Sequence, residues 1–130
     1  MNKVKYLTAS LEDYLEIIYI LYESLPSVGI TDVAKALEIS KPSVTRAIKT
    51  LKNNNLVIQE KYGKIILTHE GERIAEAVYS KHKVLRKFLI EALNVSSKTA
   101  EIDACKIEHV VSKETLDGVK SFLKKHEIEG

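Results

Sequence analysis

The spacing of apolar and polar positions along the 130-residue chain predicts six helical segments and one β-hairpin. The first helix is expected to begin at Ser10, because Ser10-Leu11-Glu12-Asp13 resembles a capping box, and to reach about Ser24. It has an apolar stripe at helical spacing, which consists of Tyr14, Ile17, Ile18, Leu21 and Leu25. Pro26 and Gly29 then end this helix.

Two further helices and a hairpin follow in the N-terminal half. A short helix is expected from Thr31, and a third helix has Pro42 in its first turn, where a missing N–H costs nothing. The third helix has an apolar stripe at i, i+4 and i+7, made of Val44, Ile48 and Leu51. Residues 56–60 and 64–68 are expected to form two strands around Lys61-Tyr62-Gly63, which predicts a β-hairpin with glycine in the turn.

The order of these elements predicts the fold class and the domains. A winged helix-turn-helix has the same order of elements: a helix, a short helix, a turn, a third helix and a hairpin. A long helix of about residues 69–93 follows, then one capped by Ser96 or Ser97 and a last one capped by Ser112. We therefore expect a mainly α protein, with a winged helix-turn-helix DNA-binding domain at 1–70 and a helical dimerisation and metal-binding domain at 71–130.

Positive charge is concentrated where a DNA duplex would dock. Six basic residues and only one acidic residue lie between Lys41 and Lys64, a local charge of +5, whereas the whole chain has +2. The remainder is therefore negative, and the local excess is the pattern expected for phosphate binding. A solvated charged face is the ordinary alternative, but the order of elements favours DNA. The expected contacts are Ser40, Lys41, Pro42, Ser43, Thr45, Arg46, Lys49, Lys61 and Lys64.

Overall composition narrows the class of protein. The chain is 45% hydrophobic and 29% charged, values typical of a soluble globular protein. It has no apolar run near the roughly 18 residues of a membrane span and no apolar signal-peptide core, so no membrane association is expected. A single cysteine cannot form an internal disulfide, which fits a reducing cytoplasm and leaves Cys105 for metal or redox chemistry.

Possible metal ligands recur at helical spacing. Cys105, Glu108 and His109 fall at i, i+3 and i+4 of one predicted helix and would share a face near one divalent ion. Asp13 and Glu16 are similarly spaced on the first helix. Each has a plainer interpretation, since Asp13 fits a capping box and Glu16 a solvated position. The sequence alone does not bring these helices together.

These blocks resemble the diphtheria-toxin-repressor and manganese-transport-regulator family. The similar segments are residues 10–19, Ser43-Val44-Thr45, Glu60-Lys61-Tyr62 and residues 105–109, in this order. The resemblance implies a homodimer that binds a palindromic DNA operator when Mn(II) or Fe(II) is bound. The thiolate of Cys105 adds Co(II) and Zn(II) as further ions expected in vitro. The resemblance also implies the ligands, which are Asp13, Glu16, His82, Cys105, Glu108 and His109. His82 taken alone equally suits a satisfied core histidine.

The chain departs from both branches of that family. It combines the Asp13 of manganese regulators with the Cys105 of iron repressors, so the physiological metal stays open between Mn(II) and Fe(II). An ancillary site of the iron repressors would involve His82, Arg86 and Glu101, and a guanidinium at Arg86 opposes a cation there. We therefore expect that ancillary site to be absent or altered.

The function expected is a metal-dependent transcriptional regulator, a repressor of metal-uptake genes. Metal would link the first helix to the dimerisation helices and so set the spacing of the two recognition helices, which must match about 34–36 Å of DNA. The main alternative is a winged-helix regulator that responds to an organic ligand or to oxidation of Cys105. An enzyme is not expected, because the sequence offers no acid–base constellation beyond the ligand set. An architectural DNA-binding protein would bind without an effector.

Overall fold

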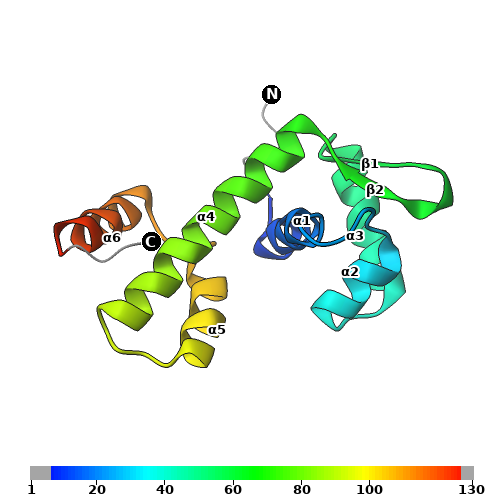
Figure 1. The fold of residues 1–130 in the computed structure, drawn as a ribbon. Helices are drawn as coiled ribbons and strands as arrows, with labels where there is room; N and C mark the ends of the chain where they lie inside the picture. The colour runs from blue at the N-terminus through cyan, green and yellow to red at the C-terminus, as the bar shows by residue number, and fades with distance from the viewer. Residues whose placement is uncertain (1–6, 127–130) are drawn as a thin grey trace. The chain divides into compact units, whose positions relative to one another are not determined.

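The computed structural model describes residues 7–126, and within them it has six α-helices and a two-stranded sheet (Figure 1). The chain divides into two compact units, Met1–Glu76 and Ala77–Gly130. The boundary falls inside helix α4 (His69–Glu91), which therefore belongs to both units. The domain boundary predicted after residue 70 remains a prediction. None of the helices within the described range has both the length and the apolar character needed to cross a bilayer.

Helices α1 (Ala9–Leu21), α2 (Ile30–Leu37) and α3 (Lys41–Asn53) form the body of the first unit and pack on one another. The α3 stripe predicted from the sequence is confirmed, because Val44, Ile48 and Leu51 are at most 1% exposed. The cap of α1 was predicted wrongly. Thr8, not Ser10, accepts the hydrogen bond from Leu11 N, so α1 begins earlier than expected and ends at Leu21.

The predicted hairpin is confirmed as the wing of this unit. Strands β1 (Val57–Gln59) and β2 (Ile65–Leu67) pair antiparallel, and a 3-10 turn, η2 (Lys61–Gly63), connects them. Gly63 has a φ of 81° in that turn, a backbone conformation that suits glycine. Ile65 N donates to Val28 O at 2.8 Å, which joins the wing to the segment before α2.

The second unit consists of the rest of α4 with α5 (Ser97–Ile107) and α6 (Lys113–Lys125). The caps are as predicted, because Ser96 accepts from Thr99 N and Ser112 from Thr115 N. Its core centres on Leu85, Ala104 and Leu116. This core places α4 and α5 side by side, which is what brings their polar side chains together (Figure 1).

Gly71 lies where the first turn of α4 meets the backbone before β1. A Cβ atom there would lie 2.0 Å from the Leu56 carbonyl oxygen, far inside contact distance. Gly71→Ala is therefore expected to lower the free energy of unfolding by at least about 1–3 kcal/mol, measured by urea denaturation. Gly118→Ala in α6 is the matched control, because nothing lies within 4 Å and alanine favours helix by about 0.5–1 kcal/mol. Equal stability of the two variants would contradict this close approach.

Candidate metal centre and nucleic-acid interface

The C-terminal end of α5 presents the central carboxylate of the second unit. The helix ends at Ile107, and Glu108 is its C-cap residue with helical φ and ψ, so Cys105 and Glu108 keep their predicted helical spacing. His109 lies just beyond the helix, which corrects the prediction that all three residues share one helical face. The side chain of Glu108 is buried, with 1% of the residue exposed, whereas Cys105 is half-buried.

His82 of α4 is held between two carboxylates of α5 and its C-cap. Nδ1 lies 2.8 Å from Glu108 Oε1, and Nε2 lies 2.9 Å from Glu101 Oε2. The hydrogen bond to Glu108 is the main cause that raises the pKa of His82 from 6.5 to about 9, and Glu101 adds to it, while burial acts in the opposite direction. His82 is therefore an imidazolium at neutral pH, and both ring nitrogens donate.

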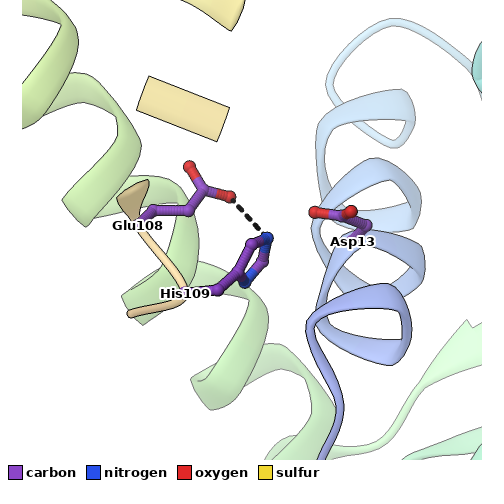
Figure 2. Close-up of side chains that lie close together, drawn as sticks. All are labelled: Asp13, Glu108 and His109. Atoms are coloured by element: carbon purple, nitrogen blue, oxygen red, sulfur yellow. Dashed lines mark ion pairs between the residues drawn. The ribbon is translucent and has the colours of Figure 1, made fainter. Parts of the chain in front are cut away.

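One oxygen of Glu108 lacks a hydrogen-bond donor among the described residues. Glu108 Oε2 is buried without such a partner, and His109 Nε2 lies 3.5 Å from it (Figure 2). An unsatisfied buried carboxylate oxygen is costly unless a cation or a donor approaches it. Carboxylate, imidazole and thiolate donors are the groups that bind divalent transition metals. The donor set of this unit therefore fits a divalent metal ion.

The other two predicted ligands lie on α1 of the first unit. Figure 2 shows Asp13 on this helix, where it is half-buried, and Glu16 is buried at 7% exposure. Because the cap is Thr8, Asp13 is not the acid of a capping box, and burial excludes the solvated interpretation of Glu16. Both plainer interpretations thus fail, and a role as metal ligands remains a prediction for these two carboxylates.

Arg86 and Glu101 form a contact that the sequence did not predict. Arg86 Nε lies 3.1 Å from Glu101 Oε1, and Arg86 Nη2 donates to Ser97 Oγ at 3.2 Å. The spacing of these residues indicates that they share helix faces with the ligands. Arg86 follows His82 by one helical turn, and Glu101 precedes Glu108 by two. The sequence predicts these residues only as an absent or altered ancillary site, whereas in the structure they form an ion pair next to His82.

The predicted recognition helix, α3, presents its polar face to solvent. Six of its predicted contact residues are exposed: Ser40, Lys41, Pro42, Thr45, Arg46 and Lys49. Ser43 is half-buried and accepts from Arg46 Nη2 at 3.3 Å. The N-cap is Ser40, whose Oγ accepts from Ser43 N at 3.3 Å. The first turn of α3 is therefore capped by Ser40 and exposes Lys41, while Arg46 and Lys49 follow further along the helix.

The wing supplies the remaining predicted contacts. Lys61 lies in the η2 turn and is exposed, and Lys64 follows the turn and is half-buried. Glu60 N donates to Lys64 O at 2.7 Å, which closes the hairpin around these lysines. Two ammonium groups on a closed hairpin suit contacts with the DNA backbone rather than with bases.

A winged helix-turn-helix unit and a helical unit with a buried carboxylate–imidazole cluster define a DNA-binding protein that responds to a ligand. Two family profiles match the chain. Residues 6–65 match "Iron dependent repressor, N-terminal DNA binding domain", and residues 68–129 match "Iron dependent repressor, metal binding and dimerisation domain". The chain belongs to this family of metal-dependent, DNA-binding transcriptional regulators, which confirms the resemblance found in the sequence.

Individual relatives agree with the family assignment. An uncharacterized HTH-type transcriptional regulator of Methanocaldococcus jannaschii is 39% identical over 92% of this chain and 96% of its own length. The HTH-type transcriptional regulator MntR of Geobacillus kaustophilus is 34% identical over 89% of this chain and 82% of its own. The family consists of transcriptional regulators rather than enzymes.

Solved structures show the same fold in longer proteins. The manganese regulator SloR superposes with a TM-score of 0.80 at 31% identity, over 91% of this chain and 55% of its own. A manganese-dependent transcriptional repressor in complex with manganese has a TM-score of 0.81 at 27% identity, over 88% of this chain and 52% of its own. This chain thus spans about half the length of these solved relatives.

Proposed function

We propose that this protein represses metal-uptake genes by binding a palindromic operator as a homodimer when Mn(II) or Fe(II) is bound. The observation that carries the proposal is the buried Glu108, whose Oε2 has no hydrogen-bond donor among the described residues and lies beside His109. A cation at this oxygen would satisfy it, and the chain also has an exposed basic helix for DNA. In this proposal the metal ion is the effector and operator binding is the output. The expected location is the cytoplasm.

The ligands would come from both units. They are Asp13 and Glu16 of the first unit and His82, Cys105, Glu108 and His109 of the second. When bound, a divalent ion supplies a centre of positive charge that carboxylate, imidazole and thiolate donors share, and so links the helices that carry them. Oxygen and imidazole donors support Mn(II) and Fe(II), and the thiolate of Cys105 would also admit Co(II) or Zn(II) in vitro.

Helix α1 would carry the restraint to the DNA-binding surface. Asp13 and Glu16 lie on α1, which packs within its unit on α3, the recognition helix. Holding these carboxylates therefore restrains α3, and a dimer in which both α3 helices are held would match two half-sites about one DNA turn apart. By linkage, operator DNA would tighten metal binding by the same factor.

The decisive experiment is an operator titration with and without Mn(II) or Fe(II). A labelled palindromic DNA is expected to bind at least about tenfold more tightly with metal, and a scrambled duplex should show no such gain. Cys105→Ser, tested with metal and with peroxide, separates a ligand role from oxidation sensing. Equal operator affinity in both conditions would overturn the proposed function.

Arg46 and Lys61 are expected to contribute differently to operator binding. Arg46 suits a bidentate contact with a guanine edge, so Arg46→Ala should cost about 1–3 kcal/mol and relax sequence preference. Lys61→Ala should weaken binding to all sequences alike and reduce the slope of log affinity against log salt by about 1. Lys35→Ala on the exposed side of α2 is the control. Fluorescence anisotropy at several salt concentrations separates the two roles. Identical slopes of log affinity against log salt for Arg46→Ala and Lys61→Ala would contradict them.

A further inference from the structure

The structure assigns a positioning role to Glu101 and Arg86. We propose that this ion pair orients His82 so that Nδ1 faces Glu108 for metal binding, while Nε2 keeps its proton. This inference rests on the proposed function, because it concerns how the same metal centre is prepared. It adds two residues that are not among the six ligands.

The geometry of His82 distinguishes its two ring nitrogens. Nδ1 points to Glu108 Oε1 at 2.8 Å, and Nε2 points to Glu101 Oε2 at 2.9 Å. Glu108 is buried and bears the oxygen without a donor, whereas the Glu101 side chain is 58% exposed. The nitrogen on the ligand side is therefore Nδ1. A metal-bound imidazole donates its other N–H to an outer carboxylate or carbonyl, and Glu101 occupies that place.

Arg86 holds Glu101 in the position that this role requires. An exposed glutamate on a helix ordinarily samples several rotamers. Here Arg86 Nε lies 3.1 Å from Glu101 Oε1, and Nη2 of the same guanidinium reaches Ser97 Oγ at 3.2 Å, at the start of α5. The arginine thus ties α4 to the first turn of α5 and leaves Glu101 Oε2 directed at His82.

The same contacts exclude Glu101 from the ligand set. Each of its two oxygens already faces a cation or an N–H donor, Oε1 at Arg86 and Oε2 at His82. A second divalent ion at Glu101 would lie next to the Arg86 guanidinium, which repels it. Exposed ion pairs contribute little to folding stability, so the effect of this pair is expected on metal binding rather than on unfolding.

Calorimetric titration of the full chain with Mn(II) tests the inference. Glu101→Gln is expected to lower Mn(II) affinity about 10–100-fold, the usual range for an outer-shell partner of a ligating histidine. Arg86→Met should lower it less, and Arg86→Lys should recover part of the loss because it retains a cation. Asp103→Asn, at another exposed position of α5, is the matched control and should bind like the unmodified protein. Thermal unfolding without metal checks that every variant folds.

Two further measurements separate positioning from a general structural effect. In the Zn(II)-loaded protein, imidazole ¹⁵N shifts of His82 should show Nδ1 bound to metal and Nε2 protonated. Arg86→Met should have no additional effect on Mn(II) affinity in a Glu101→Gln background, since Arg86 acts through Glu101.

The metal-binding measurements distinguish a failure of this inference from a failure of the proposed function. Metal bound at Nε2, or unchanged Mn(II) affinity in Glu101→Gln while the unmodified chain binds, would overturn the inference and leave the proposed function intact. If the unmodified chain and Asp103→Asn both fail to bind Mn(II) or Fe(II), the proposed function fails, and the inference fails with it.

Discussion

Replacing Glu108 by glutamine is expected to abolish metal-dependent operator binding. The carboxylate is buried, its Oε1 holds His82 Nδ1 at 2.8 Å, and its Oε2 lies 3.5 Å from His109 Nε2. The substitution removes the negative charge shared by both imidazoles and keeps the side-chain size. Mn(II) affinity should therefore fall by more than the roughly 10–100-fold typical of an outer-shell partner. Calorimetry and operator anisotropy measure the two losses.

The same variant should change the metal-free protein in a second way. Hydrogen bonding to Glu108 is the main cause of the raised His82 pKa, so this pKa should move down towards its ordinary value in Glu108→Gln. NMR titration of the imidazole follows this shift. Asp103→Asn removes an exposed carboxylate from α5 and is the control for both measurements. Retained metal response in Glu108→Gln would show that this carboxylate is not a ligand.

Metal binding is expected to become tighter as the pH rises. The pKa of His82 is about 9, so the metal-free side chain is protonated at neutral pH and must release a proton to bind an ion. From this group alone, Mn(II) affinity should increase about tenfold per pH unit below pH 9 and level off above it. At pH 7, titrations in two buffers of different ionisation enthalpy should show about one proton released from His82 per ion.

Stability of the metal-free protein should follow the opposite trend. The pKa of His82 is higher in the folded state than its ordinary value of 6.5, so its ion pairs stabilise the fold fully below pH 6.5. This contribution is lost as the pH rises through about 9, and the melting temperature of the metal-free protein should fall over that range. His82→Gln should lack this pH-dependent fall in melting temperature.

Both pH trends depend on a protonated His82. A metal affinity that is independent of pH would therefore contradict a protonated His82.

Much of the first unit was predictable because its signals are local. The buried stripe of α3, the proline in its first turn and the hairpin with Gly63 all depend on residues within a few positions of one another. Local competition also explains the error at α1. Thr8 and Ser10 both suit an N-cap, and only the backbone of the folded chain shows that Thr8 accepts from Leu11 N.

The candidate centre was predictable in residue type and not in arrangement. Helical spacing placed Cys105 and Glu108 on one face, but it did not show that α5 ends at Ile107 or that Glu108 is buried. Those facts depend on how α4 and α5 pack around Leu85 and Ala104, residues that are distant in sequence. Periodicity reports which residues share a face and carries no information about what that face meets.

The order of the elements, the basic residues of α3 and the kinds of atoms available to a metal follow from the amino-acid sequence alone. Periodicity, caps and side-chain chemistry are properties of neighbouring residues, and so they can be read directly. The folded chain is needed to place His82 between Glu101 and Glu108 and Arg86 against Glu101, and to leave Glu108 Oε2 without a donor among the described residues. Burial and pairing across helices arise from packing, which joins residues far apart in the chain.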